Sequence, residues 1–157
     1  MTVTVDIPGR QTIELSHAVL DVNGTLTQRG VVISGVIERL AQVAAQLEVH
    51  VLSADTFGTL GSVAEELGVR AHTVSTGGDK ERYVAELGAQ RCVAIGNGVN
   101  DVAMLEAAAL GIAVVGPEGA AGAAGAALSA ADVVCGSILA ALDLLLDERL
   151  LVATLRR

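Results

Sequence analysis

The sequence predicts an α/β fold in which helices cover both faces of a doubly wound parallel sheet, a three-layer Rossmann-like arrangement. Short apolar runs alternate along the chain with segments of helical periodicity. Polar residues follow several of these runs directly, and the carboxyl ends of parallel strands are where open α/β sheets bind ligands. Nothing in the composition marks a linker, so we expect a single domain over residues 1–157.

The composition indicates which residues build the core and which classes of binding partner are disfavoured. Hydrophobic residues make up 52% of the chain and aromatic residues 1%, so an aliphatic core is expected. A chain of this length buries roughly 70% of the surface that its unfolded form exposes. The net charge is −8, and the 10 basic residues are scattered, which argues against nucleic acid binding. An anionic substrate would therefore need a local cation.

The N-terminal segment and the first helix are defined by turn and cap residues. Residues 2–6 and 11–15 alternate polar and apolar side chains around a Pro-Gly turn and predict a β-hairpin. Residues 28–33 predict a short flap. Ser34 is expected to cap a helix that runs to about Leu47.

The remaining elements alternate regularly. Strands of the main sheet are predicted at residues 18–22, 49–53, 71–75, 92–95, 112–115 and 132–135. Helices are predicted at residues 60–67, 80–87, 101–109, 118–128 and 138–146. Gly68 and Gly88 are expected to end two of these helices.

Several features point to a cytoplasmic protein. Residues 1–6 lack the basic and apolar regions of a signal peptide. The Ala- and Gly-rich residues 119–146 are interrupted by polar residues, which argues against a membrane span. Cys92 and Cys135 lie in apolar runs and are expected to be buried, reduced thiols.

The segment LDVNGTLT, residues 20–27, is the most informative part of the chain. An apolar run leads into Asp21, and a Gly-Thr turn follows. This places Asp21 at the carboxyl end of the first parallel strand. A strand-end acid that caps the next turn is the alternative interpretation.

Two further residues could contact a phosphoryl group. Ser53 follows the second strand of the sheet, and its hydroxyl could donate a hydrogen bond to a phosphoryl oxygen. Lys80 opens a predicted helix, near the positive end of the helix dipole where phosphate is favoured. Taken alone, Ser53 could merely cap a helix and Lys80 could be a solvated surface residue.

The segment AIGNGVND, residues 94–101, combines an apolar strand, a Gly-rich turn and a polar cluster. Together with LDVNGTLT, Ser53 and Lys80, it resembles in order the four motifs of the haloacid dehalogenase (HAD) superfamily. The resemblance is closest to small soluble members that look like the catalytic core of a P-type ATPase without its membrane part.

The resemblance implies a hydrolase, a Mg²⁺-dependent phosphatase that acts through an aspartyl-phosphate. It gives catalytic roles to Asp21 as nucleophile, to position 23, and to Lys80. The implied phosphate-binding residues are Gly24, Ser53, Ala54 and Lys80. The implied metal ligands are Asp21, Asn23 through its backbone carbonyl, Asn97 and Asp101, with Asn100 and Asp55 in support.

Two positions depart from the family pattern. Asn23 stands where phosphatases carry the Asp that works as general acid and base, and Asn97 stands where they carry a metal-binding Asp. Because Asn23 cannot exchange a proton at neutral pH, slow turnover or a persistent phosphoenzyme is expected. Because Asn97 lacks a charge, weaker metal binding is expected.

Other functions remain open. The two Asn substitutions suit a catalytically degenerate metal- or phosphate-binding or regulatory protein. A response-regulator-like domain phosphorylated on Asp21 is a further alternative, although it needs more acidic residues near the first strand. A dinucleotide site is disfavoured because no Gly-x-Gly-x-x-Gly follows that strand.

The motif spacing leaves no room for a cap domain between Thr27 and Ser53 or between Asp55 and Lys80. In the family this goes with macromolecular phosphorylated substrates, or with closure by a neighbouring subunit. We therefore expect a small or macromolecular phosphoester as substrate and a homo-oligomer. The histidines are interpreted as structural or surface imidazoles; they are His17, His50 and His72.

Overall fold

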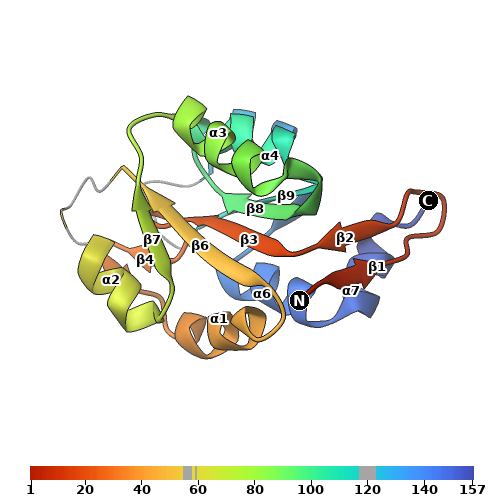
Figure 1. Ribbon diagram of the computed structural model, residues 1–157, viewed down its shortest axis with the longest axis horizontal. Helices are drawn as coiled ribbons and strands as arrows, with labels where there is room; N and C mark the ends of the chain where they lie inside the picture. The colour runs from red at the N-terminus through yellow and green to blue at the C-terminus, as the bar shows by residue number, and fades with distance from the viewer. Residues whose placement is uncertain (55–57, 59, 117–122) are drawn as a thin grey trace.

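A six-stranded parallel sheet, with β3 near its middle, forms the centre of the molecule (Figure 1). The computed structural model describes residues 1–54, 58, 60–116 and 123–157. The strand order is β10-β9-β8-β3-β6-β7, and every neighbouring pair runs parallel. The strands are β3 (His17–Asp21), β6 (Glu48–Ser53), β7 (Arg70–Thr73), β8 (Cys92–Gly96), β9 (Leu110–Val114) and β10 (Val133–Cys135). The predicted parallel sheet is confirmed.

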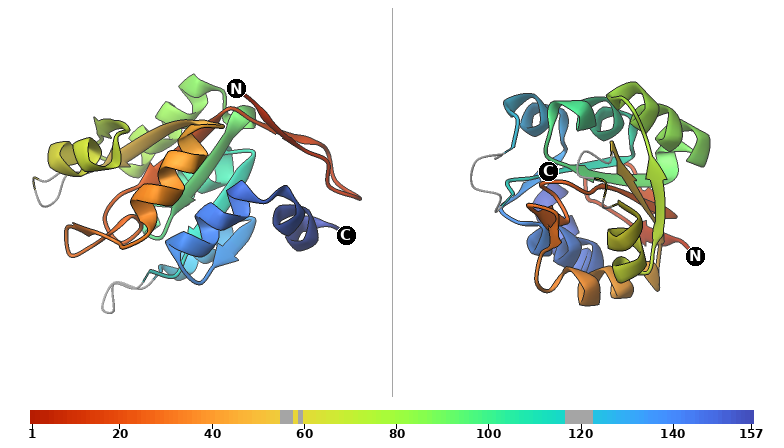
Figure 2. Two further views of the ribbon diagram at one scale, coloured as in Figure 1. Left: turned by 90° about the horizontal axis from the view of Figure 1, so that it is seen from below. Right: turned by 90° about the vertical axis from the view of Figure 1, so that its left-hand side faces the viewer.

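Helices cover both faces of this sheet, as the two views of Figure 2 show. One layer holds α1 (Val36–Ala44), α2 (Leu60–Leu67), α6 (Ile138–Leu146) and α7 (Glu148–Leu155). The other holds α3 (Gly77–Leu87), α4 (Val102–Ala107) and α5 (Gly125–Ala130). Alternate strand residues supply two separate cores: Ala18 and Leu20 face the first layer, and Val19 faces the second. The doubly wound, three-layer prediction is therefore confirmed.

Two short antiparallel hairpins flank the sheet. The first pairs β1 (Val3–Val5) with β2 (Ile13–Leu15), as predicted, and extends away from the sheet beside α7 (Figures 1 and 2). The second, β4 (Thr27–Gln28) with β5 (Val31–Val32), is the predicted flap. None of the helices in the described residues is long and apolar enough to cross a bilayer.

The boundaries of several helices differ from the prediction. Ser34 does not cap α1: Gly35 occupies the N-cap position in a left-handed conformation, φ 89°, and offers no side chain to cap the helix. The predicted helix 118–128 is described only from residue 123 onward, where α5 begins at Gly125. Two 3₁₀ turns were not predicted, η1 (Ala89–Arg91) and η2 (Val99–Asp101). These short turns lack the periodicity that reveals a longer helix.

The carboxyl edge of β3 carries little covering structure. Between β3 and β6 the chain forms only the β4–β5 hairpin and α1. Between β6 and α3, the described residues form α2 and β7. Within the described chain, therefore, no inserted domain covers the end of β3.

We predict that Leu20→Ala lowers the free energy of unfolding by about 2–5 kcal/mol, because it empties a fully buried position in β3. The measurement is urea denaturation followed by circular dichroism. Leu150→Ala is the matched control, since Leu150 is 47% exposed on α7. Equal losses for the two variants would contradict the assignment of Leu20 to the core.

Candidate active site

Three neighbouring strands bring the sequence motifs to one edge of the sheet. Asp21 ends β3, Ser53 ends β6, and Asn97 follows β8. Because β3 lies between β6 and β8, these three residues converge at its carboxyl end. Lys80 reaches the same place from α3, which packs over this part of the sheet.

Lys80 forms the centre of the site. Its Nζ donates to Asp21 Oδ1 and to Asp101 Oδ1, each at 2.7 Å. Its side chain is 1% exposed, so the alternative of a solvated surface lysine is wrong. Lys80 also does not open its helix, because α3 begins three residues earlier, at Gly77. The ammonium group therefore acts as a buried counter-ion of two carboxylates.

A capping box and a close backbone contact fix the start of α3. The Thr76 hydroxyl accepts from the Asp79 amide at 3.2 Å, and the Asp79 carboxylate accepts from the Thr76 amide at 3.0 Å. A Cβ at Gly77 would lie 2.7 Å from the Asn100 carbonyl oxygen. The first turn of α3 thus packs directly on the backbone of η2, whose last residue is Asp101.

Asp101 is held from two sides. Its Oδ2 accepts from the backbone amides of Asn97 and Gly98, each at 3.0 Å, while Oδ1 accepts from Lys80. A Cβ at Gly96 would lie 2.5 Å from Oδ2, so this carboxylate fits only against a glycine. Both oxygens of Asp101 are therefore engaged in ordering the Gly-rich turn and Lys80.

The loop after β3 wraps around a single carbonyl group. The Val22 oxygen accepts from the amides of Thr25, Leu26 and Thr27 at 2.9–3.1 Å. Gly24 adopts φ +76° there, and its amide donates to the Thr27 carbonyl at 3.1 Å. Because that N–H is used within the loop, the geometry favours a turn-forming role for Gly24 over the expected direct contact with phosphate.

Thr25 is a site residue that sequence reasoning missed. Its side chain is fully buried, and its Oγ1 lies 3.2 Å from Asp21 Oδ2 and 3.4 Å from Asn97 Oδ1. Thr25 thereby links the ends of β3 and β8. The sequence signal was only its place in the Gly-Thr turn after Asp21.

The remaining predicted residues lie around this centre. Asn23 Nδ2 donates to the Ser53 hydroxyl at 3.3 Å, so the side chain at the general acid position is turned toward the end of β6. Ser53 is buried, whereas Ala54 and Asn100 are exposed. Asp55 lies outside the described residues.

The electrostatics of the site favour an added cation. Burial and, next, the nearby Asp101 carboxylate together raise the pKa of Asp21 to about 6, against the opposing effect of Lys80. Burial acts to lower the pKa of Lys80, but Asp21 and Asp101 together hold it above its ordinary value. With both carboxylates ionised, two negative charges face one positive charge.

The donor chemistry fits Mg²⁺, which prefers hard oxygen ligands and one or two carboxylates. The Asp21 carboxylate and the Asn97 carboxamide oxygen face each other across Thr25. The Asp101 oxygens already bind Lys80 and two backbone amides, which suits contact through water. The charge of such a site would come mainly from Asp21.

Comparisons with known proteins show what this chain is similar to. The family model described as haloacid dehalogenase-like hydrolase matches residues 81–137. An uncharacterized protein of Methanocaldococcus jannaschii is 46% identical over 67 residues, which are 43% of this chain and 69% of that protein.

Solved structures share the fold. The 3-deoxy-D-manno-octulosonate 8-phosphate phosphatase of Moraxella catarrhalis was solved with a magnesium ion, a phosphate ion and a KDO molecule. It gives a TM-score of 0.64 at 17% identity, over 85% of this chain and 87% of that one. A zinc-transporting PIB-type ATPase in its E2·Pi state gives a TM-score of 0.64 at 24% identity, over 79% of this chain and 20% of that one.

We predict that Asp21→Asn stabilises the metal-free protein by about 1–3 kcal/mol at pH 7.5. The pKa of Asp21 lies at about 6 in the folded protein and near 3.8 in the unfolded chain, so above pH 6 the buried charge destabilises the fold. As the pH falls from 6 to 4 the folded state is protonated first, and the advantage of the variant should disappear. The measurement is urea denaturation in EDTA at several pH values.

Two variants serve as controls. Glu65→Gln removes the same charge from an exposed position on α2 and should change stability by less than about 0.5 kcal/mol. Lys80→Met leaves two buried carboxylates without their counter-ion and should lose about 3–5 kcal/mol. An Asp21→Asn variant less stable than the parent at pH 7.5 would contradict this account of the site.

Proposed function

This chain belongs to the haloacid dehalogenase-like hydrolases, and from that premise we propose that it is a Mg²⁺-dependent phosphohydrolase that uses Asp21 as its nucleophile. The observation that carries the proposal is the buried Lys80, which bridges Asp21 and Asp101 at the carboxyl end of β3. Burying charged groups is costly, and such groups are often found at functional sites. In the described residues, this charged network lies at the carboxyl end of β3, which no inserted domain covers.

The proposed reaction has two steps. Asp21 Oδ2, the oxygen not bound by Lys80, attacks the phosphorus atom of a phosphomonoester. The bond from phosphorus to the ester oxygen breaks, and the leaving alcohol takes a proton from solvent. A water molecule then attacks the phosphorus atom of the aspartyl-phosphate and loses its proton to solvent. The bond from phosphorus to Asp21 Oδ2 breaks, which releases phosphate and restores the carboxylate.

Neighbouring groups would stabilise the transferred phosphoryl group. Lys80 holds the Asp21 carboxylate in one orientation and supplies positive charge beside it. The Ser53 hydroxyl lies at the same edge and could donate to a phosphoryl oxygen. Mg²⁺, when bound by Asp21, Asn97 and the Asn23 carbonyl, would neutralise charge on the phosphoryl oxygens.

Asn23 determines the expected speed and the preferred leaving group. Its amide donates to Ser53 and can neither protonate the leaving alcohol nor activate water. Esters of acidic alcohols, such as aryl phosphates, need the least protonation. We therefore expect aryl phosphates to react faster than alkyl phosphates, and the second step to be slow. Because no inserted domain covers the end of β3 in the described residues, small and macromolecular phosphoesters are both candidate substrates.

A second candidate function rests on the same substitutions. Asn23 and Asn97 together remove a proton-transfer group and a metal-binding charge. A protein that binds phosphate or metal without turnover would retain the Lys80 network and lose these two carboxylates. The proposed phosphatase and this binding protein differ in whether phosphate release depends on Asp21.

We predict slow, Mg²⁺-dependent hydrolysis of p-nitrophenyl phosphate that Asp21→Asn reduces to background. The reason is that the variant lacks the nucleophile while keeping the shape of the side chain. Glu65→Gln, which makes the same charge change on α2, should retain the parent rate. Equal background rates for the parent and Asp21→Asn would favour the binding protein.

We predict that Asn23→Asp raises the rate of hydrolysis by about 10²- to 10⁴-fold for alkyl phosphates, because it restores a general acid and base. The gain should be smaller for p-nitrophenyl phosphate, whose leaving group needs less protonation. The measurement is kcat for both substrates, with Asn23→Ser as the control for loss of the hydrogen bond to Ser53. Unchanged rates with alkyl substrates would show that proton transfer at position 23 does not limit turnover.

A further inference from the structure

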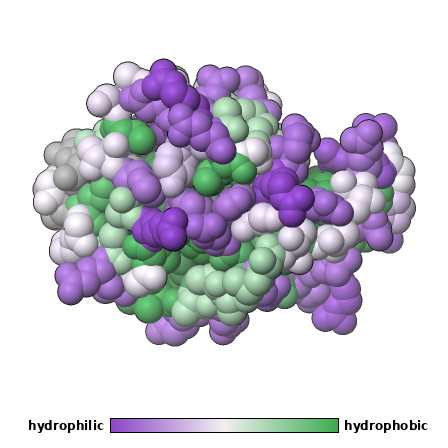
Figure 3. All heavy atoms as spheres, in the orientation of Figure 1, coloured by the Kyte–Doolittle hydropathy of each residue, from purple (hydrophilic) through white to green (hydrophobic). Residues whose placement is uncertain are grey.

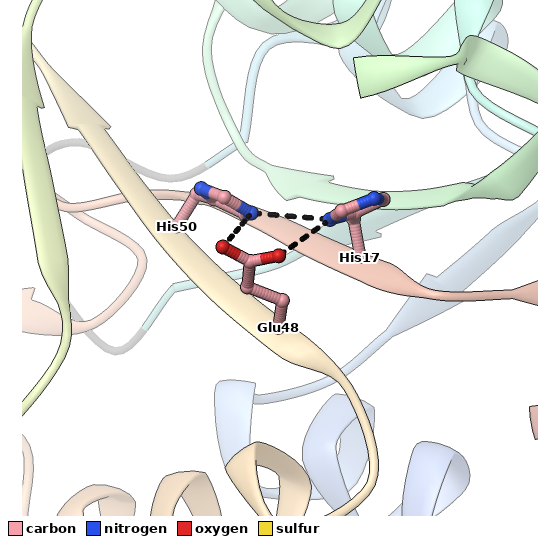
Figure 4. A group of neighbouring side chains, drawn as sticks. All are labelled: His17, Glu48 and His50. Atoms are coloured by element: carbon pink, nitrogen blue, oxygen red, sulfur yellow. Dashed lines mark hydrogen bonds and ion pairs between the residues drawn. The ribbon is translucent and has the colours of Figure 1, made fainter. Parts of the chain in front are cut away.

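All three histidines of the chain lie on the face of the sheet that α3 covers. His17 and His50 lie toward the amino ends of β3 and β6, away from Asp21. His17 is the first residue of β3 and is paired in register with Glu48, the first residue of β6. His50 follows two residues later on the same face of β6. In Figure 4, His17, Glu48 and His50 point toward one another from the two strands.

The three side chains have the spacing of metal ligands. His17 Nδ1 lies 3.2 Å from His50 Nε2 and 3.5 Å from Glu48 Oε2, and His50 Nε2 lies 3.8 Å from Glu48 Oε1. Ligands about 2.0–2.1 Å from a tetrahedral Zn²⁺ ion are about 3.3 Å apart. Two histidines with one glutamate form a known zinc donor set. We propose that His17, Glu48 and His50 bind a divalent transition-metal ion, Zn²⁺ in particular.

A hydrogen bond to its other ring nitrogen, Nδ1, orients His50 as a metal ligand. Its Nδ1 lies 2.9 Å from the Tyr83 hydroxyl, which lies 2.7 Å from His72 Nε2. If His50 Nδ1–H donates to Tyr83 and Tyr83 donates to His72, the lone pair of His50 Nε2 faces His17 and Glu48. Burial also lowers the pKa of His50, against the opposing effect of Glu48, and so favours the neutral form that binds metals.

The proposed site opens to solvent on one side. His17 and Glu48 line a cavity of about 610 Å³, whose wall also includes Arg70 and Arg91. Hydrophilic residues cover the centre of this face of the molecule, in front of β3 and β6 (Figure 3). Three protein ligands would leave the fourth position of the ion to a water molecule from this cavity.

Arg70 is the group that opposes a cation here. One of its guanidinium nitrogens lies 3.1 Å from Glu48 Oε1, and its side chain is 72% exposed. An exposed pair of this kind contributes little. Arg70 can either turn into solvent or stay on Oε1 while Oε2, the oxygen nearer His17, binds the ion. The alternative is a metal-free cluster in which one histidine donates a hydrogen bond to the other.

This site is distinct from the proposed Mg²⁺ site. His17 and Asp21 lie four residues apart on β3, which separates their backbones by roughly 13 Å. The cluster offers imidazole nitrogens, whereas the Asp21 edge offers oxygens. Divalent transition metals favour the nitrogen donors, and Mg²⁺ favours the oxygens.

The test is a Zn²⁺ titration of the full chain against a competing chelator, with any affinity tag removed and excess Mg²⁺ present. We expect one Zn²⁺ per chain, and Co²⁺ in its place should give the visible absorption of a tetrahedral site. Glu48→Gln and His17→Gln should each weaken Zn²⁺ binding by more than about 100-fold. His72→Gln, which changes a histidine outside the proposed ligand set, is the matched control and should weaken it far less.

Three outcomes would overturn the proposal: no Zn²⁺ bound by the parent, unchanged affinity in Glu48→Gln and His17→Gln, or loss of binding in Asp21→Asn. Glu48 is half exposed, so Glu48→Gln should fold even if His17→Gln does not, and thermal denaturation checks both. Phosphate release from p-nitrophenyl phosphate should be unchanged in Glu48→Gln. Failure of the zinc site would therefore leave the proposed hydrolysis standing, and the reverse also holds.

Discussion

The buried ammonium group of Lys80 is the constraint on which the rest of the active edge depends. A lysine this deep is tolerable only because two carboxylates lie at 2.7 Å from it. Those carboxylates come from the end of β3 and from η2, so three separate elements must be positioned together. The capping box at Thr76, the contact of Gly77 with the Asn100 backbone, and the missing Cβ of Gly96 all serve that positioning. The network still holds an excess of negative charge, which a bound cation would balance.

The function proposed for this edge follows from a difference in how the two carboxylates are held. Asp101 accepts from Lys80 and from two backbone amides, so its position is fixed within the protein. Asp21 accepts from Lys80 at one oxygen and, among the described residues, from the Thr25 hydroxyl alone at the other. The second oxygen of Asp21 is therefore the one that can reach a substrate or a metal ion. One carboxylate orders the site, and the other is the proposed nucleophile.

The sequence predicted the strands of the sheet and the residues gathered at the site better than it predicted the burial of Lys80. Strand ends at Asp21, Ser53 and Asn97 follow from apolar runs, and parallel strands bring such ends to one edge. The start of α3 was missed because Gly77 and Gly78 suggest a loop, although Thr76 and Asp79 form a capping box. Because α3 begins at Gly77, Lys80 lies within the helix and its side chain is buried. The histidine cluster depends on the register of His17 with Glu48, which requires the strand order and cannot be obtained from spacing along the chain.

The two sites share a strand and a helix, which ties their geometry together. β3 carries His17 at its amino end and Asp21 at its carboxyl end. Lys80 and Tyr83 are three residues apart on α3, so they lie on one side of the helix, and each contacts one of the two sites. A rotation of α3 that moved Lys80 away from Asp21 would also move Tyr83 away from His50. The hydrogen-bonded cluster at the amino end, with or without its proposed metal ion, therefore helps to fix the helix that carries Lys80.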